Sequence, residues 1–130
     1  MCYFSDKLTK SSNAQGDDME ISEEQINGSI TKITLSGRLD IQGVGEIETK
    51  FAGMTASPRT AVITDMSKVP YISSIGIRLL ISSVKAINAR KGKFALFGTQ
   101  PDVNMVITIS GLDKIIPSFD TLEAAIDFVK

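Results

Sequence analysis

One segment of the sequence joins a buried strand to an amphipathic helix: Asp65-Met66-Ser67-Lys68-Val69-Pro70-Tyr71-Ile72-Ser73-Ser74-Ile75-Gly76-Ile77-Arg78-Leu79-Leu80. The apolar run just before it is typical of a parallel-sheet strand, which we expect over residues 60–65. Apolar residues then recur at helical spacing and predict a helix over residues 74–89. Ser73 and Ser74 lie at the junction, where a helix N-terminus offers free N–H groups and a partial positive charge. Because a phosphate is tolerated there, the segment suggests a phosphorylation switch more than a catalytic centre.

Strands and helices alternate on both sides of this segment. We expect strands over residues 19–25, 30–36, 93–97 and 114–117, and helices over residues 40–54, 101–110 and from 122 onward. The dipeptide Asn27-Gly28 predicts a hairpin between the first two strands. The first helix should bury one face, formed by Ile41, Val44, Ile47, Phe51 and Met54. Gly43 and Gly45 should weaken its first turn.

The order of these elements predicts an α/β fold. We expect a mixed β-sheet of about five strands, opened by an antiparallel hairpin, with about four helices packed mainly on one face. The chain of 130 residues fits one domain, and its 42% hydrophobic content can supply a core. Residues 1–18 are polar and predict a flexible N-terminal tail, which leaves residues 19–130 as the folded domain.

Composition excludes several classes of function. The formal net charge of −1 gives no electrostatic case for binding nucleic acid or an anionic membrane, and no apolar run approaches the roughly 20 residues that span a bilayer. The absence of histidine excludes a histidine base, a Ser-His-Asp triad and histidine metal ligands. Cys2 is the only cysteine, so an intrachain disulfide is impossible and we expect a cytoplasmic protein with no metal site.

Three segments of the sequence resemble the STAS domain family, and within it the bacterial anti-sigma factor antagonists. Ser36-Gly37-Arg38-Leu39-Asp40 is similar to the family's strand-to-helix segment, and residues 65–80 are similar to its central signature. Gly98 to Pro101 and Ser110-Gly111-Leu112-Asp113-Lys114-Ile115-Ile116 are similar to the later pattern. The resemblance covers about residues 19–130, and three segments in the right order and spacing are far more specific than one.

The resemblance implies a set of site residues. The phosphoacceptor of the family lies two residues before the signature glycine, which here is Ser74 before Gly76, and Ser73 is the second choice. An aspartate often precedes the acceptor, where this chain has Ser73, and a serine or alanine often follows it, where this chain has Ile75. The surface that meets the partner is implied at Asp40, Tyr71, Ser73, Ile75, Gly76 and Arg78.

The resemblance also implies partner switching, a form of transcription regulation. Unphosphorylated, the domain would bind an anti-sigma factor with a serine kinase fold and free the sigma factor. That kinase, using its own ATP and Mg²⁺, would phosphorylate Ser74 and be released, and a metal-dependent serine phosphatase would reset the switch. The domain itself would be a phosphoprotein without catalysis, metal or cofactor, a monomer when free.

Each residue also has a purely structural interpretation. Ser73, Ser74 and Asp40 are good helix N-caps. Gly76 fits a tight packing position, and Arg78 fits a solvated helix face. Asp65 fits a turn in which it bonds Ser67.

Two other functions stay open at this point. One is a STAS module that scaffolds a sensory complex or a lipid-transport assembly, with Ser74 only a helix cap. The other is a small α/β enzyme or nucleotide-binding protein that uses residues 65–74, although the sequence lacks a phosphate-binding glycine-rich loop with lysine.

Overall fold

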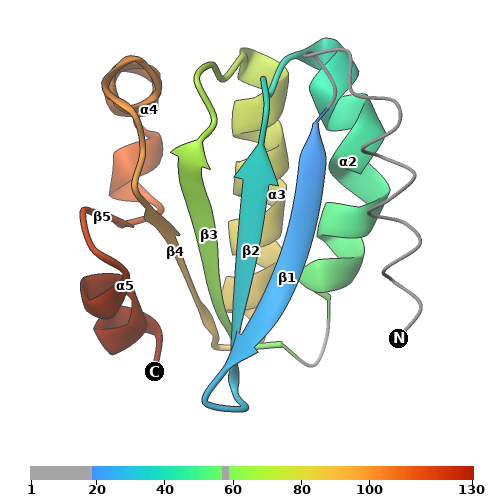
Figure 1. The fold of residues 1–130 in the computed structure, drawn as a ribbon. Helices are drawn as coiled ribbons and strands as arrows, with labels where there is room; N and C mark the ends of the chain where they lie inside the picture. Colours follow the sequence, from blue (N-terminus) through green and yellow to red (C-terminus); the bar gives the residue numbers. More distant parts are fainter. Residues whose placement is uncertain (1–18, 57–58) are drawn as a thin grey trace.

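The computed structural model describes residues 19–56 and 59–130 (Figure 1). The predicted tail, residues 1–18, lies outside these residues, as do residues 57 and 58. A single five-stranded sheet has the order β1-β2-β3-β4-β5, and its strands are β1 (Glu20–Ile26), β2 (Ile30–Ser36), β3 (Ala61–Lys68), β4 (Lys93–Phe97) and β5 (Ser118–Phe119). The helices are α2 (Ile41–Met54), α3 (Ser74–Ala89), α4 (Pro101–Ser110) and α5 (Leu122–Val129), with a 3₁₀ turn η1 (Leu112–Lys114).

The sheet is mixed, as predicted. Strands β1 and β2 pair antiparallel, and Asn27 (φ 55°) and Gly28 (φ 74°) form the turn between them. Two successive residues with positive φ give a turn whose twist matches that of the flanking strands. Strands β2, β3, β4 and β5 are parallel, so β2, β3 and β4 all end at the same side of the sheet, which we call the carboxyl edge. In Figure 1 this edge lies at the top, where α2 and α3 begin.

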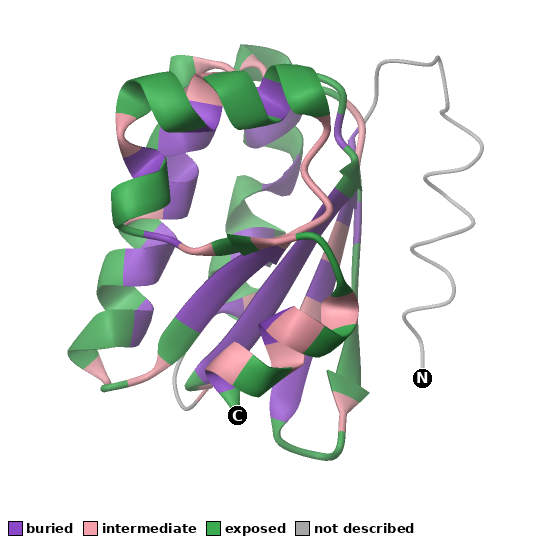
Figure 2. Ribbon diagram, turned by 90° about the vertical axis from the view of Figure 1, so that its left-hand side faces the viewer, coloured by how far each residue is buried: buried purple, intermediate pink, exposed green. Residues whose placement is uncertain are grey.

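The helices pack mainly on one face, which confirms the predicted architecture. Helices α2, α3 and α4 share the larger core with the inner side of the sheet, around the fully buried Phe51, Phe94 and Leu80. Among the helices of the described residues, only α5 packs on the opposite face, over a smaller cluster that includes Ile30, Ile63 and Ala95. Figure 2 shows buried residues concentrated along the strands between these helices. Within the described residues, no helix is long and apolar enough to cross a membrane.

Two predicted strand boundaries are wrong. Strand β3 continues to Lys68 rather than ending at Asp65, because a register shift after Thr34 lets Ser36 of β2 pair with Lys68. The edge strand expected at residues 114–117 lies instead at Ser118–Phe119. Gly111 has φ 82° and turns the chain into η1, which takes up Lys114 before the chain can reach the sheet.

The predicted buried face of α2 is wrong at its first residue. Asp40 is the N-cap, which leaves Ile41 at the first helical position with 76% of its surface exposed. In the first turn, the buried residues are Gly43 and Val44. The prediction holds for Val44, Ile47 and Phe51, and Met54 packs partly buried against the same core.

Candidate functional site

Two loops that are distant in sequence run side by side at the carboxyl edge. The backbone N–H of Gly37 donates to the carbonyl of Lys68 (3.0 Å), and that of Leu39 donates to the carbonyl of Tyr71 (2.9 Å). Leu39 and Ile72 form a parallel bridge, and both side chains are buried. The two loops therefore extend the parallel pairing of β2 and β3 beyond the sheet, and they place the start of α2 beside the start of α3.

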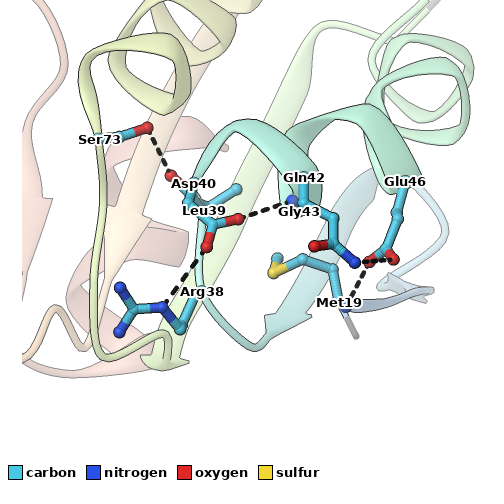
Figure 3. Close-up of polar contacts among 8 residues, drawn as sticks. All are labelled: Met19, Arg38, Leu39, Asp40, Gln42, Gly43, Glu46 and Ser73. Carbon is cyan, nitrogen blue, oxygen red and sulfur yellow. Dashed lines mark hydrogen bonds and ion pairs between the residues drawn. The ribbon is translucent and has the colours of Figure 1, made fainter. Parts of the chain in front are cut away.

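The structure separates the roles of the two serines at this edge. Ser73 is the N-cap residue of α3, but its Oγ donates to the carbonyl of Leu39 (2.9 Å) and accepts no bond from α3 (Figure 3). Ser73 is thus half-buried and already bonded. Ser74 is the first residue of α3 and is exposed, and its side chain makes no hydrogen bond within residues 19–56 and 59–130. The interpretation of Ser74 as the helix cap is therefore wrong, because α3 begins one residue earlier than that interpretation requires.

Asp40 caps α2 and faces a cation at the same time. Its Oδ1 accepts from the backbone N–H of Gly43 (2.8 Å), and its Oδ2 lies 3.5 Å from Nε of Arg38 (Figure 3). The Gly43 hydrogen bond is the main cause that lowers the pKa of Asp40 below its usual value of 3.8; Arg38 adds to the effect, and partial desolvation opposes it. The carboxylate thus stays charged at neutral pH, next in sequence to Leu39, which is hydrogen-bonded to Ser73.

Replacing Asp40 with asparagine should reveal this charge in the pH dependence of stability. Asp40→Asn keeps a capping oxygen but loses the charge, so we expect a loss of about 0.3–1 kcal/mol in the free energy of unfolding at pH 7. Because the folded pKa is lowered, the contribution of the carboxylate is present above pH 3.8 and is lost as the pH falls through the folded value. Urea denaturation of both proteins from pH 7 to pH 3 measures the difference, and a gap that widens in acid would contradict the assignment.

Gly76 is buried in the first turn of α3, where it packs against the carboxyl edge. A Cβ at this position would meet Cγ1 of Ile72 at 2.9 Å, the carbonyl oxygen of Leu39 at 3.0 Å and Cβ of Leu39 at 3.1 Å. The packing interpretation of Gly76 therefore holds: the first turn of α3 approaches the paired loops too closely for a side chain.

The remaining predicted residues surround Ser74. Tyr71 is 40% exposed and Arg78 is exposed one turn further along α3, while Ile75 is half-buried against the core.

Asp65 lies away from these residues and has a structural role. Its Oδ1 accepts from the N–H (2.9 Å) and Oγ (2.7 Å) of Ser67, and its Oδ2 lies 3.8 Å from Nζ of Lys32. The turn interpretation of Asp65 is confirmed. Within the described part of the chain, no three acidic or cysteine side chains could together hold a metal ion.

Two features of the site were missed by sequence reasoning. The first is Arg38, whose guanidinium carbon lies 4.3 Å from the centroid of the Tyr71 ring. The second is a groove of about 440 Å³ between α2 and α3, lined by Val44, Glu48, Ala52, Thr55, Ala56, Ile75, Arg78, Leu79, Ser82, Ser83, Ala86 and Arg90. Small residues, Ser82 and Ala86 at helical spacing on α3 and Ala52 on α2, were the available signal for the groove.

The fold and the sequence both match known proteins. RsfB of Mycobacterium tuberculosis, an anti-sigma-F factor antagonist, is 25% identical over 114 residues, which cover 88% of this chain and 92% of RsfB. The crystal structure of an anti-sigma factor antagonist from Mycobacterium paratuberculosis has a TM-score of 0.79 at 24% identity, and covers 88% of this chain and 96% of that one.

SpoIIAA of Bacillus matches in both of its solved forms. The unphosphorylated form has a TM-score of 0.70 at 25% identity, covering 84% of this chain and 95% of SpoIIAA. The phosphorylated form has a TM-score of 0.65 at 25% identity, covering 85% and 100%. The sequence profile of the STAS domain matches residues 22–125. With this match across the five-stranded sheet and its helices, the chain belongs to the STAS domain family.

Proposed function

We propose that this protein is an anti-sigma factor antagonist that acts by partner switching through Ser74. The observation that carries the proposal is the contrast between two neighbouring hydroxyls. Ser74 is exposed at the first position of α3, whereas Ser73 is half-buried and bonded to Leu39. A kinase needs an accessible hydroxyl, and the free N–H groups at the start of α3 favour the phosphate that it would add. Ser74 is therefore the proposed phosphoacceptor.

The names of the related proteins support the same role. RsfB is named an anti-sigma-F factor antagonist, and SpoIIAA is named an anti-sigma factor antagonist whose structure was solved with and without phosphorylation. By analogy, the unphosphorylated chain would bind an anti-sigma factor and so release a sigma factor. The chain would act as ligand and substrate, not as an enzyme.

The proposed partner surface is the carboxyl edge around Ser74. Asp40 and Tyr71 are partly exposed on the paired loops, and Arg78 is exposed on α3. Ile75 would contribute its exposed part at the head of the groove between α2 and α3. Ser73 and Gly76 would act mainly by holding the loops in place, through the Leu39 hydrogen bond and the close approach to Ile72.

The partners follow from this assignment. An anti-sigma factor with serine kinase activity would bring ATP and Mg²⁺ and transfer the phosphate to Ser74. The phosphate adds about −1.5 to −2 charges and three acceptor oxygens, whose desolvation in a close interface favours dissociation. A metal-dependent serine phosphatase would restore the binding form, and the free chain would be a monomer.

Mass spectrometry of the protein isolated from its native cells tests the proposal. We expect a phosphate that phosphatase treatment removes and that peptide mapping assigns to Ser74. Mapping to Ser73 alone would keep the mechanism and overturn the site. An unmodified chain under several growth conditions, including those that induce sigma-factor responses, would overturn the switch and favour a STAS scaffold.

A further inference from the structure

The backbone of Arg38 is held on both sides. Gly37 is hydrogen-bonded to the last residue of β3 (3.0 Å), and Leu39 is hydrogen-bonded to the loop before α3 (2.9 Å). The Arg38 carbonyl lies against Gly43 in the first turn of α2. The side chain therefore leaves from a fixed point of the carboxyl edge, between the starts of α2 and α3.

The side chain of Arg38 is also oriented. Its guanidinium carbon lies over the Tyr71 ring at 4.3 Å, and its Nε points to Asp40 at 3.5 Å. In the described part of the chain, neither of its two Nη atoms has a hydrogen-bond partner, and the side chain is 49% exposed. The contact with the Tyr71 ring and the contact of Nε with Asp40 fix the guanidinium and leave its two Nη atoms free. Because the group is preorganised, it loses less entropy when it binds a carboxylate.

The fold gains little from this arrangement. The Arg38–Asp40 contact is long and partly exposed, and such pairs contribute little to stability. The cap of α2 rests on the shorter Asp40–Gly43 hydrogen bond (2.8 Å). Arginine and tyrosine are, however, enriched among the few residues that carry most of the binding energy in protein interfaces.

The charge of the two paired loops and the first turns of α3 indicates what Arg38 meets. Residues 36–40 and 66–78 carry three cations, Arg38, Lys68 and Arg78, and one carboxylate, Asp40, a formal charge of +2 in a chain of net charge −1. All three cations are exposed. An acidic partner surface would be complementary to this edge. A phosphate on Ser74, with about −1.5 to −2 charges, would cancel that attraction.

We infer that Arg38, stacked on Tyr71, is a specificity-determining contact that receives a carboxylate of the partner through its free Nη pair. The inference rests on the proposed function and adds to it the chemistry of the partner: an Asp or Glu within an acidic patch. It also gives the switch a physical cause, because phosphorylation of Ser74 neutralises the edge that attracts this patch.

Charge substitutions at Arg38 test the inference. The probe is the anti-sigma factor kinase recovered with the tagged chain from its native cells, purified and used without ATP. Arg38→Glu should weaken kinase binding by about 10–30-fold and should make the affinity depend less on salt concentration. Arg38→Lys should weaken binding by only about threefold, because lysine keeps the positive charge and loses the two-pronged guanidinium. The matched control is Lys91→Glu, in the turn just beyond the far end of α3 and also exposed, which should stay within about twofold of wild type.

The outcomes separate this inference from the function on which it rests. If Arg38→Glu binds like Lys91→Glu while Ser74→Asp loses binding, the Arg38 contact is refuted and the switch stands. If Ser74→Asp also binds like wild type, the proposed function fails. Arg38→Gln guards against misfolding beside Asp40: it is neutral, should weaken binding by about 3–10-fold, and should keep the wild-type thermal midpoint.

Discussion

Ser74→Asp is expected to lower the affinity for the anti-sigma factor kinase by about 10²–10³-fold, whereas Ser74→Ala should bind as tightly as wild type. The hydroxyl of Ser74 is exposed and makes no hydrogen bond among the described residues, so alanine removes nothing that the fold uses. Aspartate instead places a negative charge where Arg38 and Arg78 leave the edge positive. Titration of the purified kinase with each variant measures the effect.

Folding and binding can be told apart in this experiment. An aspartate at the first position of α3 interacts favourably with the helix dipole, so Ser74→Asp should unfold at the same temperature as wild type or slightly above it. Ser29→Asp, an exposed serine after the hairpin turn at the other end of the sheet, is the matched control and should bind normally. Equal binding by Ser74→Asp and Ser74→Ala would place the switch elsewhere.

Local signals were sufficient for most of the fold. The Asn27-Gly28 turn, the apolar run of β3 and the helical spacing after Ser74 each act over a few residues, and the structure contains all three elements. The mixed sheet followed from the initial hairpin and the alternation of strands and helices after it. The segment that surrounds Ser74 was also recognised, because its motif is continuous in sequence.

What sequence reasoning missed depends on contacts between distant residues. Which of the two serine hydroxyls is already bonded is decided by the carbonyl of Leu39, which accepts from both the N–H and the Oγ of Ser73 across 34 positions. Arg38 is a candidate because its guanidinium lies over the ring of Tyr71, on a loop that is distant in sequence. Ile41 fits the apolar stripe of α2, and only the position of the cap at Asp40 shows that it faces outward.

The two glycines at the start of α2 make the same point, and they give the second large expected effect. Sequence reasoning treats Gly43 and Gly45 alike, as weak positions in a helix. In the structure Gly43 is buried, and a Cβ there would collide with the carbonyl oxygen of Arg38 and approach Cγ of Met19 at 2.7 Å. A Cβ on Gly45 would have nothing within 4 Å. Neither residue has a positive φ, so backbone strain does not distinguish them.

Gly43→Ala and Gly45→Ala should therefore change stability in opposite directions. Gly43→Ala forces α2 away from the Arg38 backbone and strains the Asp40 cap, so we expect the free energy of unfolding to fall by about 2–3 kcal/mol. Gly45→Ala adds helix propensity without a clash and should raise it by about 0.5–1 kcal/mol. Urea denaturation measures both changes, provided that the dependence of the unfolding free energy on urea concentration stays the same.

Because the displaced segment carries Arg38 and Asp40, Gly43→Ala should also weaken kinase binding, whereas Gly45→Ala should not. Equal effects of the two substitutions would mean that α2 does not press against the Arg38 segment as closely as the structure indicates.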